Sequence, residues 1–145
     1  MKSKILSVFI GLLVLCWTLP ARSQLGDTLQ PPLSVKQIMN ALITPSSATI
    51  WGAYQLETEA EWLEIENAAL TVIAAGSLLA GWAAGSEDQA WAAEADWQSY
   101  NSQMMAAARL VITAVGQKDE AALSSAGNDA LYPPCESCHQ QYQAR

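Results

Sequence analysis

Apolar side chains recur every three or four residues along most of the chain, a spacing typical of amphipathic helices rather than strands. The first predicted helix covers 35–43 and begins with a capping box between Ser34 and Gln37. Proline has no N–H and crowds the preceding helical turn, so we expect Pro45 to kink or end this helix. A short further helical stretch is then predicted as far as Tyr54.

A second capping box, Thr58 to Glu61, opens a longer predicted helix that runs to about Ala80, with Gly81 as its stop. The remaining predicted elements are a loop over 81–93 with a turn of helix near Trp91, a helix over 94–115 ended by Gly116, a helix over 119–131 capped by Asp119, an interruption at Pro133 and Pro134, and a short helix over 135–143. This pattern predicts an all-α fold, most simply an antiparallel four-helix bundle.

The N-terminus has the pattern of a secretory signal peptide over 1–23. Lys2 and Lys4 precede an apolar run over 5–19, and small residues follow it. The run is shorter than the roughly 20 apolar residues that span a bilayer, so we expect cleavage rather than an uncleaved anchor helix, and no stable membrane insertion afterwards. The mature part, 24–145, is the size of one domain.

Charge is unevenly distributed along the chain. Three of the seven basic residues lie in 1–23 and all fourteen acidic residues lie after it, so the mature chain carries a formal net charge of −10. An acidic chain without a basic stripe excludes a nucleic-acid binder. It suits partners with a basic docking patch. The densest acidic run, 57–66, is most simply a solvated helix face, with docking as the alternative.

The most specific chemical signal lies near the C-terminus. Cys135, Cys138 and His139 form a Cys-x-x-Cys-His string, the attachment signature of c-type haem. We call these five residues, 135–139, the haem string. Two thiols about one helical turn apart can each add to one haem vinyl group, and the adjacent imidazole can bind the iron. Cys16 leaves with the signal peptide, so these are the only Cys and His residues of the mature chain.

Three other interpretations of this string are open. A zinc site needs four ligands, more than the Cys and His of the mature chain supply. A thioredoxin-type Cys-x-x-Cys follows a strand, and no strand pattern precedes this one. A structural disulfide suits an exported protein but leaves His139 without a role. We therefore predict one covalent haem c. Nothing resembles a catalytic triad, a phosphate loop or a paired-carboxylate site, so we do not expect an enzyme.

Further segments match a known family. They are Val35-Lys36-Gln37-Ile38-Met39, Pro45 followed by Ile50-Trp51, Trp62, Lys118-Asp119, Leu131-Tyr132, and the haem string close to the C-terminus with Tyr142 behind it. Over roughly 33–142 the chain resembles the class II c-type cytochromes, the cytochrome c-prime family. The resemblance implies a four-helix bundle with one haem in the periplasm and single-electron transfer between redox partner proteins. Dimers are common in that family, so a homodimer is also an expectation.

The sixth iron ligand separates two functions. Met39 lies on the inner stripe of the first predicted helix and matches the family's distal position; the alternative is a methionine that only fills the core. Met104 and Met105 are weaker candidates. A bound thioether would suit electron transfer. Without it, a five-coordinate iron would bind or scavenge a small gas such as NO or CO.

The predicted haem pocket includes residues from both ends of the chain. Ile38, Met39 and Leu42 would make its distal side apolar. Tyr132 and Tyr142 flank the haem string and are candidate pocket residues, with core packing as the alternative for each.

Overall fold

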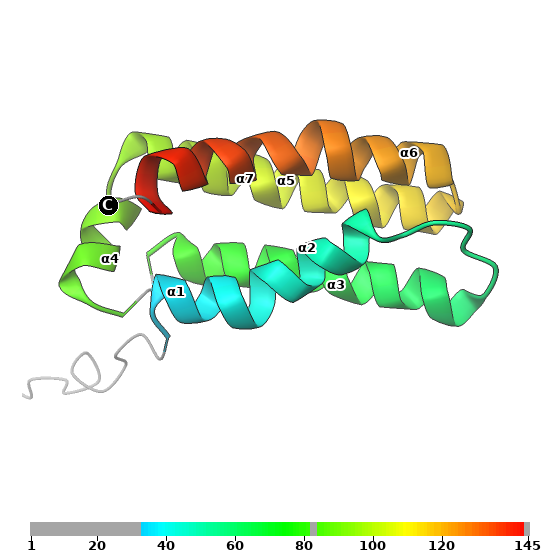
Figure 1. Ribbon diagram of the computed structural model, residues 1–145, viewed down its shortest axis with the longest axis horizontal. Helices are drawn as coiled ribbons and strands as arrows, with labels where there is room; N and C mark the ends of the chain where they lie inside the picture. The colour runs from blue at the N-terminus through cyan, green and yellow to red at the C-terminus, as the bar shows by residue number, and fades with distance from the viewer. Residues whose placement is uncertain (1–32, 82–83, 144–145) are drawn as a thin grey trace, which may run out of the picture.

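The computed structural model describes residues 33–81 and 84–143, and every regular element in those ranges is helical (Figure 1). The elements are α1 (Val35–Ile38), η2 (Met39–Ile43), α2 (Thr44–Trp51), α3 (Glu59–Leu79), α4 (Ser86–Ala92), α5 (Ala95–Gln117), α6 (Glu120–Ser125), η3 (Ala126–Leu131), α7 (Tyr132–Cys138) and η4 (His139–Gln143). Those marked η are π-type turns, wider than an α-helical turn. The all-α prediction is confirmed. The predicted signal peptide, 1–23, lies outside the described residues.

Several elements follow one another without a break. We call α1, η2 and α2 together the N-terminal rod (35–51), and α6, η3, α7 and η4 together the C-terminal rod (120–143). In Figure 1 the N-terminal rod lies in one layer with α3, and the C-terminal rod lies in the other layer with α5. The most extensive contact joins α3 to α5, and α4 lies at one end of the molecule.

The predicted helix starts are confirmed by their caps. The hydroxyl of Ser34 accepts the Gln37 N–H, and that of Thr58 accepts the Glu61 N–H, each with the reciprocal bond of a capping box. The Asp119 carboxylate likewise accepts the Ala122 N–H at 3.0 Å. The predicted stop at Gly116 is wrong, because α5 continues to Gln117 and ends on a left-handed residue at 118, with φ of 51°.

Small apolar residues make the interface between α3 and α5. Ala69, Val72 and Ala75 on α3, with Ala108 and Val111 on α5, are fully buried. Their size lets the two helices approach closely. At Gly76 an added Cβ would lie 2.5 Å from the Met105 side chain. This interface is the centre of the hydrophobic core.

The prolines inside the rods do not end the helices. Pro45 follows η2, where the Thr44 N–H bonds to the carbonyl of Met39, five residues earlier. Pro133 follows η3, where the Tyr132 N–H bonds in the same way to Gly127. A wider turn gives the crowded carbonyls before a proline more room, so the chain stays helical. The predicted interruption at Pro133 and Pro134 is therefore wrong. The predicted extension of the helix to Tyr54 is wrong, because α2 ends at Trp51 and Tyr54 lies beyond it.

By length and composition, α3 is long and apolar enough to cross a membrane, and no other helix of the described ranges is. In this fold its apolar stripe, which includes Trp62, Ile65 and Leu79, is buried against the neighbouring helices. The core helix of a compact protein has the same composition, so this feature does not by itself indicate a membrane span.

Candidate functional site

The haem string lies where α7 passes into η4. Cys138 is three residues and His139 four residues after Cys135, spacings that place the three side chains on one face of the rod. Both cysteines are half-buried and not joined in a disulfide, while His139 is exposed. All three line one cavity of about 340 Å³.

This first cavity lies between the two rods, with α5 contributing to its wall. Apolar and aromatic side chains predominate. It is lined by Met39, Ile43, Thr44, Ser47, Ala48, Trp51, Leu79, Trp97, Tyr100, Asn101, Met104, Tyr132, Pro134, Cys135, Glu136, Cys138 and His139. A largely apolar cavity with a few convergent polar groups is the usual form of a cofactor site.

A second cavity of about 590 Å³ adjoins the first. The two share Met39, Thr44, Trp97, Cys138 and His139 as wall residues. The second cavity is more polar, since charged groups from α1 and α4 also line it, among them Lys36 and Asp88. Met39 and His139 thus border both spaces from opposite rods.

The structure brings together some of the predicted pocket residues and not others. Met39 and Tyr132 line the first cavity, and Tyr142 lines the second. Ile38 is fully buried in the core and Leu42 is half-buried, and neither lines these two cavities.

The π-type turn accounts for Thr44, which the sequence did not indicate, while Ile43 lines the first cavity where a regular helix would also place it. A regular helix would place Leu42 and Ile43, three and four residues on, beside Met39. In η2 the hydrogen bond spans five residues, from the Thr44 N–H to the Met39 carbonyl, so Thr44 lies one turn above Met39. Thr44 accordingly lines both cavities with Met39.

Several wall residues were not expected from the sequence. Ser47 continues the face of the N-terminal rod, and Tyr100 and Asn101 come from α5. Pro45 is the signal that could have indicated the shifted face, because an internal proline requires a local change of helical register. Nothing in the local sequence marks Asn101. It is buried, donates to the Gly76 carbonyl at 2.8 Å, and its Oδ1 atom has no hydrogen-bond partner.

The two cysteine thiols lie in surroundings that keep them neutral. Burial raises the pKa of Cys135 to about 11. Burial, together with the charge of the neighbouring Cys135, raises that of Cys138 to about 11 as well. Thiols that exchange disulfides have lowered pKa values, so this microenvironment is unlike that of a thioredoxin-type site.

An aromatic cluster holds the η4 turn that carries His139. The ring centroid of Tyr142 lies 5.1 Å from that of Trp97 and 5.9 Å from that of Trp91. The Tyr142 hydroxyl donates to Glu94 at 2.8 Å. Burial first, and then this hydrogen bond, raises the pKa of Tyr142 to about 12. The buried ring and its bonded hydroxyl fix the C-terminal turn against α4 and α5.

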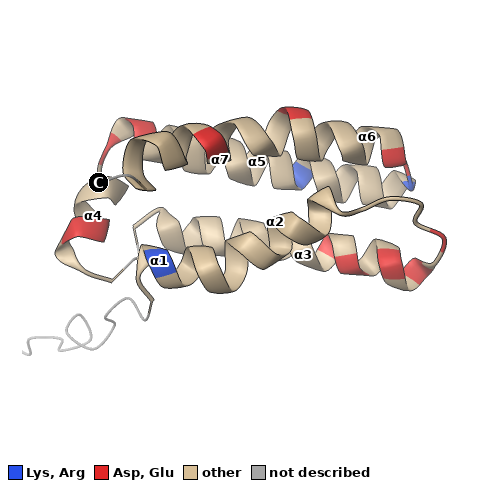
Figure 2. Cartoon of the chain, in the orientation of Figure 1, with Lys and Arg blue, Asp and Glu red and all other residues tan. Residues whose placement is uncertain are grey.

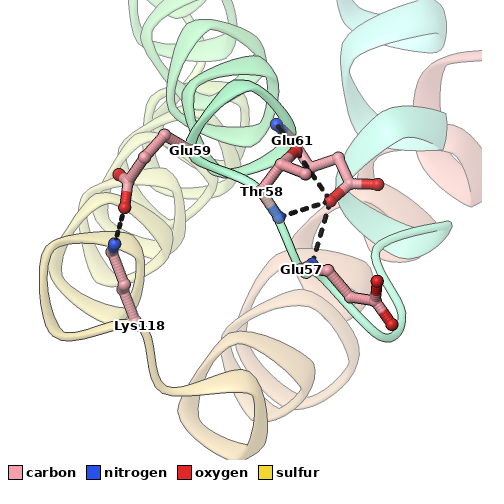
Figure 3. A network of polar contacts seen from close by, with 5 residues as sticks. All are labelled: Glu57, Thr58, Glu59, Glu61 and Lys118. Carbon is pink, nitrogen blue, oxygen red and sulfur yellow. Dashed lines mark hydrogen bonds and ion pairs between the residues drawn. The ribbon is translucent and has the colours of Figure 1, made fainter.

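Carboxylates near the start of α3 form local bonds, of which the one from Glu61 caps the helix (Figure 3). One oxygen of Glu61 accepts the N–H groups of Glu57 and Thr58 at 2.9 and 2.7 Å, and backbone hydrogen bonds, foremost that from Thr58, lower its pKa. Glu59 pairs with Lys118 across the gap to α5. Glu120 accepts the Leu56 N–H at 2.8 Å. These carboxylates stabilise the turn regions at one end of the molecule.

Comparison of the chain with family models, with characterised proteins and with solved structures finds no match. Within 33–81 and 84–143, no three His, Cys, Asp or Glu side chains converge as a chelating group of the kind that binds a metal ion directly.

Proposed function

We propose that this protein is a monohaem c-type cytochrome that transfers single electrons between redox partners. Its two rods, with α3 and α5, would form the antiparallel four-helix bundle of the class II cytochromes. One observation carries the proposal: Cys135, Cys138 and His139 line the same largely apolar cavity, opposite Met39. The unbonded thiols and the imidazole are the donor set that a covalent haem needs, so the residues fit the group.

The residues have distinct roles in this proposal. The thiols of Cys135 and Cys138 would hold the haem, each by adding its S–H across one vinyl double bond, so that sulfur would bond to one carbon and hydrogen to the other. His139 would bind the iron through its imidazole. When bound, the haem supplies a reversible one-electron couple. Trp97 and the other apolar wall residues exclude water from it.

Met39 is the proposed sixth ligand, and Met104 is the competitor. Both line the first cavity, but only Met39 also borders the second cavity together with His139. A thioether ligand raises the reduction potential of haem iron, which suits electron transfer. Met105 lies against Gly76 at the α3–α5 interface and lines neither cavity.

A second candidate function is the binding of a small gas. One observation favours it: two adjoining cavities border Met39 and His139, which leaves space beside an iron that Met39 does not bind. Both functions place the protein in the periplasm after removal of 1–23, where haem attachment to such strings takes place. The formal charge of the mature chain, −10, favours redox partners with basic contact faces.

The proposal is tested by absorption spectroscopy of the protein exported together with the haem-attachment machinery. We expect a c-type haem spectrum that persists after denaturation, and its loss when Cys135 and Cys138 are both replaced by Ser. The matched control, Ser137→Ala, changes the residue between them and should retain the spectrum. An exported wild type without haem absorption would refute both candidate functions.

The sixth ligand is tested on the same preparation. If Met39 binds the iron, the wild type has a low-spin spectrum that becomes high-spin in Met39→Ala and not in Met104→Ala. A high-spin wild type that shifts on addition of carbon monoxide would favour gas binding instead.

A further inference from the structure

Two exposed aromatic side chains stand at the edge of the first cavity. Trp51 of α2 is 42% exposed and Tyr132 of α7 is 50% exposed, and both line the cavity that Cys135 and His139 border. Their rings meet edge to face, with centroids 6.1 Å apart. The pair therefore joins the two rods across the cavity and also faces solvent.

Both side chains are held in place before any partner arrives. The indole N–H of Trp51 donates to the Gly127 carbonyl at 3.0 Å. The hydroxyl of Tyr132 donates to Glu136 at 3.2 Å. Since their polar ends are bonded, the exposed parts are mainly apolar ring surface. Rigid aromatic groups of this kind lose little entropy on binding and often anchor protein interfaces.

The charge around this pair has one sign. Glu136 accepts the hydrogen bond of the Tyr132 hydroxyl at 3.2 Å, and Asp129 lies in the η3 turn that directly precedes Tyr132 on the same rod. No Lys or Arg occurs in α2, η3 or α7, and Figure 2 shows only acidic positions along the η3 and α7 stretch. A partner with cationic side chains around an apolar centre would match this surface.

The acidic run 57–66 is a poorer docking surface. Its Glu59 and Glu61 are engaged in an ion pair and a cap. It lies around the start of α3, at the end of the molecule away from α4, and no residue of 57–66 lines either cavity. The aromatic pair, by contrast, shares a cavity wall with the haem string.

We propose that Trp51 and Tyr132, with Asp129 and Glu136 beside them, form the contact surface for a redox partner protein that presents Lys or Arg around an apolar patch. The inference rests on the proposed electron-transfer function and specifies where the partner docks. Docking there places the partner against the cavity that holds the haem string, and the carboxylates steer its approach.

The test compares equal charge changes at two places on the full, haem-loaded mature chain. Asp129→Lys alters the proposed surface, and Glu64→Lys alters the exposed face of α3. The probe is a lysine-rich c-type cytochrome, and stopped-flow absorbance gives the second-order rate of electron transfer to it. At low ionic strength we expect Asp129→Lys to slow the reaction about tenfold and Glu64→Lys less than about twofold, with the difference reduced by salt.

A second pair of variants guards against misfolding, because Asp129 also accepts a hydrogen bond from Ser125 at 2.7 Å. Asp129→Asn keeps an acceptor oxygen and should slow the reaction about threefold, against Glu64→Gln as its control. Equal rates within each pair in haem-loaded protein would overturn the docking surface and leave the cytochrome proposal intact. Absence of haem from the wild type would overturn both.

Discussion

The α3–α5 pair and the two rods differ in the regularity of their helices. α3 and α5 are uninterrupted over 21 and 23 residues, and fully buried small side chains join them. Each rod contains proline and a π-type turn, η2 before Pro45 and η3 before Pro133. The regular pair builds the centre of the core, while the irregular rods supply most of the cavity wall. Stability and the candidate site thus depend largely on different helices.

The largest effect is expected at the regular interface. Val72→Asp would bury a carboxylate without a partner at a fully enclosed position, and should destabilise the fold by about 4 kcal/mol or more. The control is Leu70→Asp on the exposed face of the same helix, which should change stability by less than about 1 kcal/mol. Urea unfolding followed by circular dichroism measures both. A similar loss of unfolding free energy in the two variants would show that the α3–α5 interface is not the main source of stability.

The next effect concerns the wide turn of the N-terminal rod. Pro45→Ala restores an N–H that can bond to the carbonyl of Ala41, so η2 should narrow toward a regular helix and stability should rise by about 1 kcal/mol. Thr44 would then no longer share a face with Met39, and the haem spectrum should change. Ala41→Gln, on the exposed side of the same turn, should leave the spectrum unchanged. An unaltered spectrum in Pro45→Ala would contradict the register argument.

A smaller effect is expected at the aromatic cluster. Tyr142→Phe removes the hydrogen bond to Glu94 and should cost about 1 kcal/mol at neutral pH. The folded-state pKa of Tyr142 is raised from 10 to about 12, so its neutral form stabilises the fold fully below pH 10, and that contribution is lost as the pH rises toward 12. The free energy of unfolding, measured with urea between pH 9 and 12, should therefore fall more steeply with pH for the wild type than for Tyr142→Phe. Parallel curves would exclude this linkage.

The sequence predicted where both rods and α3 begin, and missed the irregular turns inside the rods. Ser34, Thr58 and Asp119 marked the helix starts correctly because capping depends on local residues. The haem string also placed Cys135 and His139 on one cavity wall. The cavity wall from the N-terminal rod was predicted less well: Leu42 lines neither cavity and Thr44 lines both, because a period of 3.6 residues does not describe a π-type turn. Wall residues from α5, such as Asn101, depend on tertiary packing that no local pattern reveals.

The smallest effect is expected at the solvent-exposed cap of α3. Backbone hydrogen bonds lower the pKa of Glu61 below its ordinary 4.5, so its ionised form stabilises the fold above that pH, and the contribution is lost as the pH falls through the lowered value. Glu61→Gln keeps the cap geometry and should slightly reduce the loss of stability at acid pH. Glu64→Gln is the control on the same helix and should lose stability at acid pH as the wild type does. Thermal unfolding between pH 2 and 6 distinguishes them, and identical profiles for the two variants would remove the role assigned to Glu61.

The central claim is that one haem is covalently attached at Cys135 and Cys138. The most direct test is the intact mass of the exported, purified protein under denaturing conditions. The account predicts a single species with the mass of 24–145 plus one haem, and the mass of the polypeptide alone when both cysteines are replaced by Ser. A wild-type mass equal to that of the polypeptide with two free thiols or one disulfide would contradict it.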